Sequence, residues 1–123
     1  MASTFPFTSA LVTGASSGIG EAMAELLGAA GVPTVVVARR SDRLHALAER
    51  FPSIEVLAAD LGSAAGLAAV VARVEHEAAP IDLVVNNAGF GTSGEFHELD
   101  PDRLDAEVQL NVAALTRLSR AAL

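Results

Sequence analysis

The sequence predicts an α/β fold built on a doubly wound parallel sheet. Short apolar runs alternate with longer segments in which apolar residues recur every three or four positions, the patterns of buried strands and of amphipathic helices. Parallel strands need right-handed crossover connections, so this alternation places helices on both faces of the sheet. A glycine-rich turn directly after the first apolar run indicates a ligand site at the carboxyl ends of the strands.

The first half of the chain contains two strand–helix units. Residues 9–14 form the first expected strand, and the helix expected over 18–30 follows it. A β-branched strand at 34–38 comes next, and Ser41 is the expected N-cap of the second helix. The apolar face expected for the first helix consists of Ile19, Met23, Leu26, Leu27 and Ala30.

The second half repeats this rhythm. Residues 54–59 and 81–87 form the third and fourth expected strands, and Ser63 is placed to cap the helix between them. Asp100-Pro101 is typical of a helix start, with a capping side chain and a proline in the first turn. The apolar face expected for this last helix is continuous over Leu104, Val108, Asn111, Leu115 and Leu118.

The expected strand order is 3-2-1-4 in one domain over residues 1–123. This order puts the topological switch point between the first and fourth strands, beside residues 13–20 and 86–91, where a ligand is expected. A flavodoxin-like sheet is the alternative fold, and it would also use the end of its first strand.

Composition excludes several classes of function. A net charge of −7 argues against nucleic acid or an anionic membrane as the main partner. No apolar run is long enough to span a membrane, and the first residues lack a signal-peptide pattern, so a cytoplasmic location is expected. The chain has no cysteine, and its histidines are dispersed, so no metal site is expected.

The turn TGASSGIG contains Gly14, Gly18 and Gly20 between the first strand and the first helix. Glycine permits both a tight turn and close approach of the backbone to an anion. The following helix N-terminus then offers unpaired N–H groups to a pyrophosphate. The Gly-x3-Gly-x-Gly spacing differs from the usual dinucleotide fingerprint, and a turn without a ligand is the alternative.

The end of the second strand carries Arg39 and Arg40 where an NAD site usually has a carboxylate. Guanidinium groups bind a 2′-phosphate through charge-assisted bonds, so a preference for NADP(H) over NAD(H) is expected. Two solvated charges at a strand end are the alternative. After the third strand, Asp60 is placed to accept from the adenine amine and Leu61 to cover the ring, although Asp60 also suits helix capping.

Together with NNAG at 86–89, these segments resemble the short-chain dehydrogenase/reductase family. The matching segments are TGASSGIG (13–20), ARR (38–40), AADL (58–61), NNAGFG (86–91) and LNVAAL (110–115). The resemblance implies a Rossmann-type fold and hydride transfer between a nicotinamide and a small-molecule carbonyl or alcohol substrate. It also implies a homo-oligomer.

The resemblance assigns the cofactor-binding roles position by position. It implies pyrophosphate and ribose contacts, a 2′-phosphate site, an adenine site, and a segment that runs from the adenosine ribose toward the nicotinamide; Asn86 would brace the central strands. The pyrophosphate and the neighbouring ribose would contact Gly14, Ser16, Ser17, Gly18, Ile19 and Gly20. The 2′-phosphate would contact Arg39 and Arg40, and the adenine would contact Asp60 and Leu61. The segment that runs from the adenosine ribose toward the nicotinamide would be Asn87, Ala88 and Gly89. Many NADP-preferring members have a basic residue at the position of Ser17, so here the preference depends on the two arginines.

Asn111 is the catalytic residue that the resemblance supplies. A polar amide on an apolar helix face has to be hydrogen-bonded, because leaving it unpaired costs about 1–3 kcal/mol. The family's asparagine at this position bends the helix and holds a water in a proton relay to a lysine. An interior asparagine bonded only to the local backbone is the alternative.

The family's remaining chemistry depends on a Ser…Tyr-x3-Lys pattern, and this sequence contains neither tyrosine nor lysine. We therefore expect residues 1–123 to be a truncated, cofactor-binding first half of an oxidoreductase, inactive alone. Two alternatives stay open at this point. One is a non-catalytic nucleotide-binding or sensor module, and the other is an interaction subunit whose partner supplies the missing groups.

Overall fold

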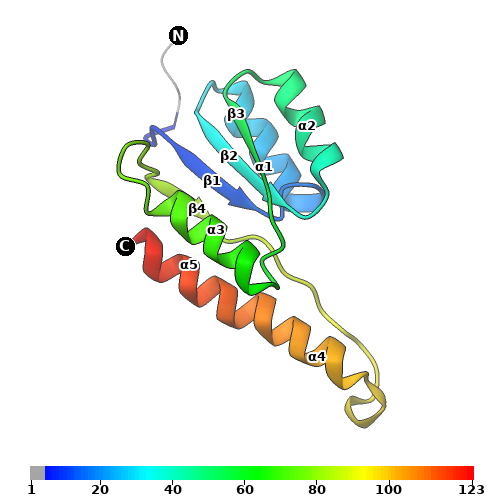
Figure 1. Ribbon diagram of the computed structural model, residues 1–123. Coiled ribbons are helices and arrows are strands. Elements are labelled where there is room, and N and C mark those ends of the chain that lie inside the picture. Colours follow the sequence, from blue (N-terminus) through cyan, green and yellow to red (C-terminus); the bar gives the residue numbers. More distant parts are fainter. Residues whose placement is uncertain (1–4) are drawn as a thin grey trace.

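The computed structural model describes residues 5–123 and contains a four-stranded parallel sheet with helices on both faces (Figure 1). The strand order is β3-β2-β1-β4, with every neighbouring pair parallel. This confirms the predicted order and excludes the flavodoxin-like alternative, because β4 and not β3 lies beside β1. The strands are β1 (Ala10–Thr13), β2 (Thr34–Ala38), β3 (Ile54–Ala58) and β4 (Leu83–Val85).

The helices follow the strands along the chain, and the last of them consists of three segments joined end to end. A 3-10 turn, η1 (Phe96–Glu98), precedes that long helix, and a π-helical segment, η2 (Gln109–Ala114), lies within it. The α-helices are α1 (Gly18–Ala29), α2 (Ser41–Arg50), α3 (Ala64–Val74), α4 (Pro101–Val108) and α5 (Leu115–Ala122).

The sheet has a separate hydrophobic core on each face. In β1, Val12 packs with α1 and α2, whereas the adjacent Leu11 packs with α3 and α5. Successive strand side chains point to opposite faces, and both faces are covered, which explains why every position of the central strands β1 and β2 is buried. The fold therefore places the carboxyl ends of all strands at one edge of the sheet, between the two helical layers.

Local capping signals predicted the helix starts with one exception. Ser63 Oγ accepts a hydrogen bond from Gly66 N at 3.0 Å, and an Asp100 carboxylate oxygen accepts one from Asp102 N at 3.2 Å, so both predicted caps are confirmed. The prediction for Ser41 was wrong, because α2 begins at Ser41 and its N-cap is Arg40, which makes no side-chain capping bond.

The predicted apolar face of α1 was wrong in part. Ile19 is 73% exposed and Leu26 is 64% exposed, while the buried residues of this helix are Gly20, Ala24, Leu27 and Gly28. A Cβ on Gly28 would lie 2.7 Å from the Phe51 ring, so the helix packs through small residues four positions apart. Close backbone contact, and not the bulk of the side chains, selects the buried face.

The predicted face of the last helix was also wrong in part, and after Val108 the π-helical segment changes the helical period. Val108 is 58% exposed and Leu115 is 40% exposed, whereas Ala114 and Leu118 are buried. A π-helical turn carries an extra residue, so the side chains after it rotate away from the positions that a regular helix would give. The structure places Asn111 inside this segment.

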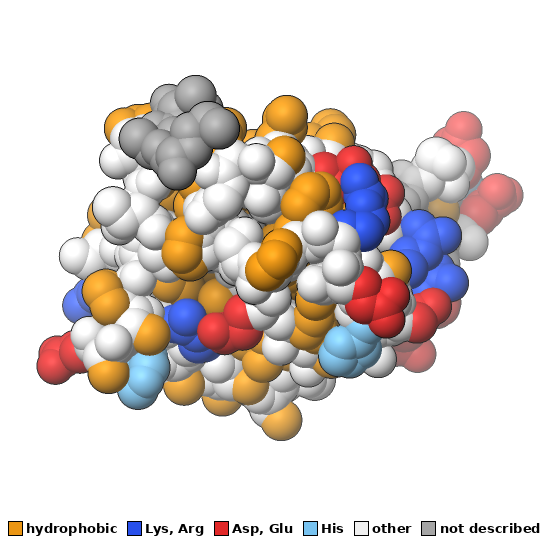
Figure 2. Space-filling model, turned by 90° about the horizontal axis from the view of Figure 1, so that it is seen from above, with side chains coloured by type: hydrophobic (Ala, Val, Ile, Leu, Met, Phe, Trp, Pro, Cys, Tyr) orange, Lys and Arg blue, Asp and Glu red, His pale blue; other side chains and the backbone are white. Residues whose placement is uncertain are grey.

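The face seen in Figure 2 has hydrophobic side chains in small groups, with acidic and basic side chains lying next to one another between them. Within residues 5–123, none of the helices has both the length and the apolar character needed to cross a membrane.

Candidate cofactor site

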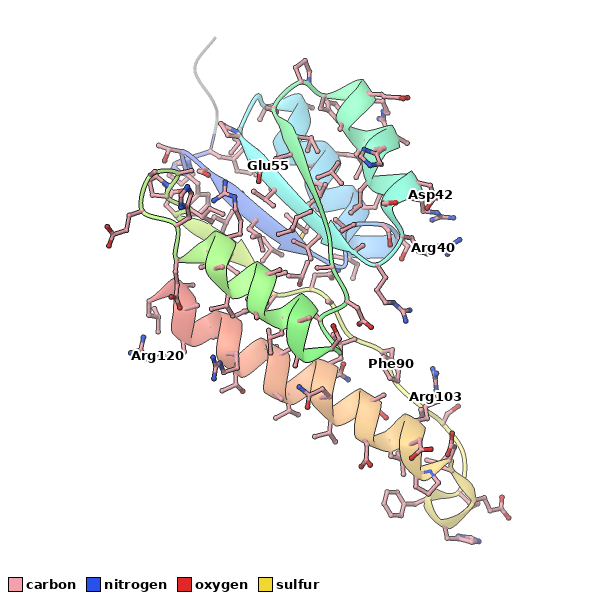
Figure 3. The ribbon with its side chains drawn as sticks, viewed as in Figure 1. Arg40, Asp42, Glu55, Phe90, Arg103 and Arg120 are labelled. Carbon is pink, nitrogen blue, oxygen red and sulfur yellow. The ribbon has the colours of Figure 1, made fainter. Side chains whose placement is uncertain are left out.

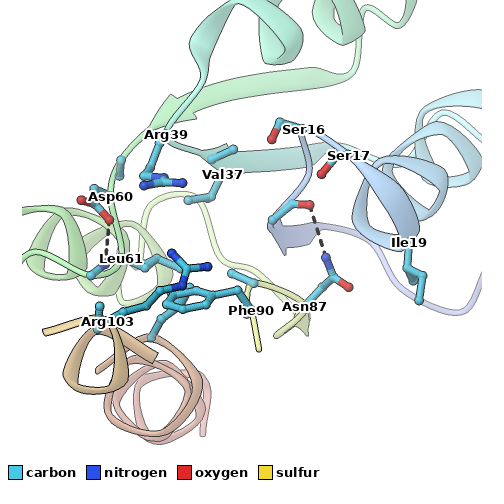
Figure 4. A pocket seen from close by; sticks show the side chains of 18 residues that line it. Ser16, Ser17, Ile19, Val37, Arg39, Asp60, Leu61, Asn87, Phe90 and Arg103 are labelled. Atoms are coloured by element: carbon cyan, nitrogen blue, oxygen red, sulfur yellow. Dashed lines mark hydrogen bonds between the residues drawn. The ribbon is translucent and has the colours of Figure 1, made fainter. Parts of the chain in front are cut away.

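A cavity of about 640 Å³ lies at the carboxyl ends of the strands, where the switch point was predicted. It is bounded by the loops after all four strands, by the start of α1 and by α4 (Figure 4). The residues that line it are Gly14, Ser16, Ser17, Ile19, Val37, Ala38, Arg39, Ala59, Asp60, Leu61, Gly62, Asn87, Ala88, Gly89, Phe90, Arg103, Ala106 and Leu110.

The glycine turn brings the chain back across the end of β1. Gly14 and Gly18 have φ angles of 65° and 58°, a left-handed conformation that favours glycine. Gly20 has a different constraint, because a Cβ there would overlap the Gly14 carbonyl oxygen and Asn87 Nδ2. The N-cap residue Ser17 makes no side-chain capping bond, so the first N–H groups of α1 are left for an anion.

Thr13 fixes the loop after β4 against the end of β1, a role that the sequence did not reveal. Its buried Oγ1 accepts hydrogen bonds from Asn87 N at 3.0 Å and Ala88 N at 2.9 Å, and donates to Val85 O at 3.3 Å. Asn87 Nδ2 donates to the carbonyl oxygens of Thr13 and Gly14, both at 3.2 Å. The loop and the glycine turn therefore form one hydrogen-bonded unit.

The neighbouring Asn86 has a different partner. Its Nδ2 donates to Ser119 Oγ on α5 at 3.1 Å, so it ties the strand end to a helix. Among the described residues, bracing between β1 and β4 at this end of the sheet comes from Thr13 and Asn87, and not from Asn86 as the resemblance implied.

The three arginines near the end of β2 lie in different places. Arg39 lines the cavity, while Arg40 does not and lies on the outer side of the molecule at the start of α2 (Figure 3). Arg43, from the first turn of α2, donates from Nη1 to Ser16 O at 3.0 Å and so ties α2 to the glycine turn. Only Arg39 therefore presents its charge directly to the cavity from this segment.

Asp60 serves the local turn and the cavity together. Its Oδ1 accepts from Gly62 N at 2.9 Å, while Ser63 provides the cap of α3. One oxygen atom of the carboxylate is thus used within the loop, and Asp60 still lines the cavity beside the buried Leu61. The alternative that Asp60 caps the next helix was therefore wrong, and its bond within the turn is compatible with a role as an acceptor at the cavity.

Asn111 is half-buried and hydrogen-bonded to both backbone polar groups of Phe90. Nδ2 donates to Phe90 O at 2.6 Å, and Oδ1 accepts from Phe90 N at 3.1 Å. A Cβ on Gly89 would lie 2.9 Å from Asn111 Oδ1, so the preceding residue has to be small. The polar amide on this helix is therefore satisfied by the cavity wall.

Most of the predicted site residues line the cavity together, and the exceptions have clear positions. Gly18 and Gly20 shape the turn behind it, Arg40 is the N-cap of α2, and Asn111 supports the wall through Phe90. Sequence reasoning missed the cavity-lining residues Val37, Ala38, Ala59, Gly62, Arg103, Ala106 and Leu110. For those on the last helix, the repeat of Arg103, Ala106 and Leu110 at helical spacing was the available signal.

No cluster of three or more histidine, cysteine, aspartate or glutamate side chains within residues 5–123 is arranged to hold a metal ion. The cavity instead combines open backbone N–H groups with the guanidinium groups of Arg39 and Arg103, the carboxylate of Asp60 and apolar walls. That set of groups suits an anionic ligand that also has an apolar ring.

Comparison with known proteins gives the same family throughout. The short chain dehydrogenase family profile matches residues 8–123. Nodulation protein G of a Rhizobium species is 35% identical over 112 residues, which cover 90% of this chain and 46% of that protein.

Two solved structures are also similar. The bulky-bulky ketone specific alcohol dehydrogenase from Comamonas testosteroni superimposes with a TM-score of 0.88 and 40% identity, covering 94% of this chain and 47% of that one. A short-chain dehydrogenase from Sphingobium yanoikuyae in complex with NADPH gives a TM-score of 0.87 and 42% identity, covering 93% and 46%.

This chain spans about half the length of the relatives that it matches. Within that half, the family profile covers every strand and every helix of the structure. The chain belongs to the short chain dehydrogenase family.

Proposed function

We propose that residues 1–123 form the cofactor-binding half of an NADP(H)-dependent oxidoreductase. The observation that carries this proposal is the position of Arg39, which lines the same cavity as the N-terminus of α1. The end of β2 reads Ala38-Arg39-Arg40 and offers no carboxylate to repel a 2′-phosphate. A solved relative at 42% identity is itself an NADPH complex, which supports the same cofactor here.

The residues present fit such a cofactor. The free N–H groups at the start of α1, with the hydroxyls of Ser16 and Ser17, would hold the pyrophosphate. Asp60 and Leu61 would hold the adenine, and the segment from Asn87 to Gly89 would run along the ribose and toward the nicotinamide. Glycine at positions 14 and 20 lets the turn lie close to Asn87, because a side chain at either position would fill the space between them.

A bound nicotinamide supplies hydride transfer, for which we propose a carbonyl or alcohol substrate. This chain's own contribution is to bind and orient the cofactor. Asn111 fixes the wall at Phe90 through two hydrogen bonds, and its part in a proton relay stays a prediction from the family resemblance. The sequence contains neither the tyrosine nor the lysine that such a relay uses in the family.

Equilibrium titration with NADPH and with NADH tests the proposal. We expect the wild-type chain to bind NADPH more tightly than NADH. Arg39→Ala is expected to weaken NADPH binding by about tenfold or more, the value of a lost charge-assisted contact, and to leave NADH binding within about twofold.

Arg40→Ala is the matched control, since it removes the same charge from the adjacent residue, which lies outside the cavity. Equal affinities for the two cofactors in the wild-type chain would contradict the proposed preference. So would equal losses in the two arginine variants. Consumption of NADPH with a carbonyl substrate, measured on the gene product that carries this segment, tests the oxidoreductase assignment itself.

A further inference from the structure

We propose that Arg103 is a stacking residue for the cofactor's adenine, held in place by Phe90. One face of its guanidinium lies against the Phe90 ring, and its other face would stack on the nucleobase. This inference rests on the proposed function, and it adds a ligand contact from α4, on a different wall of the cavity from Arg39.

The geometry fixes one face of this guanidinium. Arg103 Cζ lies 4.6 Å from the centroid of the Phe90 ring, within the range of a cation–π contact. Both side chains line the cavity and lie side by side (Figures 3 and 4). The Phe90 backbone is itself held by the two hydrogen bonds from Asn111, so the ring is a supported platform and not a free loop side chain.

Within the part of the chain that the structure describes, the charge of Arg103 has no carboxylate partner. None of the ion pairs among residues 5–123 includes it. Arg50 provides a direct comparison, because it also lies over a phenylalanine ring, with Cζ 4.9 Å from the Phe51 centroid. Its Nη1, however, lies 3.6 Å from Glu25 Oε1, and it is remote from the cavity. Of the two stacked arginines, the one without an acid partner is the one at the cavity.

The surroundings of Arg103 favour a ring over a phosphate. Its neighbours on the same face of the last helix are Ala106 and Leu110, which provide apolar surface and no hydrogen-bond donors from their side chains. Asp60, across the cavity, is an acceptor suited to an exocyclic amine and would repel a phosphate. Planar guanidinium groups stack on nucleobases with little dependence on further contacts. The 2′-phosphate is left to Arg39.

The test is a binding titration with four probes: NADPH, NADH, ADP and reduced nicotinamide mononucleotide, which lacks the adenosine. Arg103→Ala is expected to weaken the first three by a common factor of about three to ten, the range of a stacking contact, and to leave the mononucleotide unchanged. Arg103→Lys keeps the charge without the planar face, so we expect it to resemble Arg103→Ala. Arg50→Ala is the matched control and should change none of the affinities.

The other possible results of the titration would overturn either the stacking role of Arg103 or the proposed function. A loss confined to NADPH, or recovery of affinity in Arg103→Lys, would show that charge acts at this position and would overturn the stacking role. Unchanged ADP binding in Arg103→Ala would overturn it as well. Failure of the wild-type chain to bind any dinucleotide would instead overturn the proposed function. This failure is distinguishable from failure of the stacking role, because it is observed with the wild-type chain alone. Urea unfolding of each variant checks that the fold is intact.

Discussion

Asn111 and Phe90 form a closed two-bond contact in which the side-chain amide replaces a backbone partner. The π-helical segment carries Asn111 out of the regular helical spacing, and the amide then meets both the N–H and the C=O of Phe90. The π-helical segment and the position of a cavity wall are therefore linked through one side chain.

Replacement of Asn111 by leucine, which has a similar volume, should lower the free energy of unfolding by about 1–3 kcal/mol. Both backbone groups of Phe90 would lose their partner in a half-buried setting. Urea unfolding measures the change. Gln109→Leu is the control, because its exposed side chain makes no hydrogen bond within residues 5–123, and a surface change of this kind stays within about 0.5 kcal/mol. Equal losses in the two variants would contradict the proposed support of the wall.

This contact also marks the limit of sequence reasoning. The strand at 34–38 and the caps Ser63 and Asp100 were predicted correctly because their signals lie within a few residues. The face of the last helix was not, because a period of 3.6 was assumed through a segment that the structure makes π-helical. A polar residue within an apolar stripe was the available sign of that change.

Long-range contacts account for most of what the sequence left out. Thr13 begins the turn motif TGASSGIG, but the residues that donate to its hydroxyl are more than 70 positions away in the chain. Arg103 looks like a solvated charge on a polar helix until Phe90 is placed beside it. The motifs therefore located the cavity, while the residues that brace or close it required the fold.

Thr13→Val should be markedly more destabilising than the same substitution at Thr34. Both residues are buried in neighbouring strands, but Thr13 Oγ1 accepts from two backbone N–H groups, whereas Thr34 Oγ1 donates to Val32 O alone. Loss of the two acceptor contacts should cost about 2 kcal/mol, against about 1 kcal/mol at Thr34. Thermal or urea unfolding of the pair checks this, and similar losses would mean that the loop after β4 does not depend on Thr13.

Alanine substitutions in the glycine turn should separate two reasons for glycine. Gly18 has a positive φ, but no atom lies within 4 Å of the position that a Cβ would take, so Gly18→Ala carries only the left-handed penalty of about 1–2 kcal/mol. Gly20→Ala forces a methyl group onto backbone and Asn87 atoms and should cost about 3 kcal/mol.

The matched control for both is Gly91→Ala, in the loop after β4. Gly91 has no positive φ, and a Cβ there would meet its nearest neighbour, Glu107 Oε1, at an ordinary 3.9 Å. We expect a change within about 0.5 kcal/mol in urea unfolding. A smaller loss for Gly20→Ala than for Gly18→Ala would contradict the close approach of α1 to the turn.

Asp82 should make the stability of the fold sensitive to acid. The backbone N–H of Thr8, the N–H of Ser9 and the Thr8 hydroxyl all donate to its carboxylate, and they hold the pKa of Asp82 below its ordinary value of 3.8. These bonds join the residues before β1 to those before β4. Since the unfolded chain binds the proton more readily, this contribution is fully present above 3.8 and is lost as the pH falls through the lower, folded-state pKa.

Urea unfolding of the wild-type chain and of Asp82→Asn at a series of pH values measures this contribution. Between about pH 5 and 7 the wild-type chain should be the more stable by a constant margin, and below pH 3.8 the two curves should converge. The control is Asp105→Asn, which removes a carboxylate that accepts no hydrogen bond within residues 5–123. The free energy of unfolding of this variant should therefore differ little from that of the wild-type chain. A margin for Asp82→Asn that persists unchanged well below 3.8 would mean that the amide disturbs the contact sterically, and not through the charge.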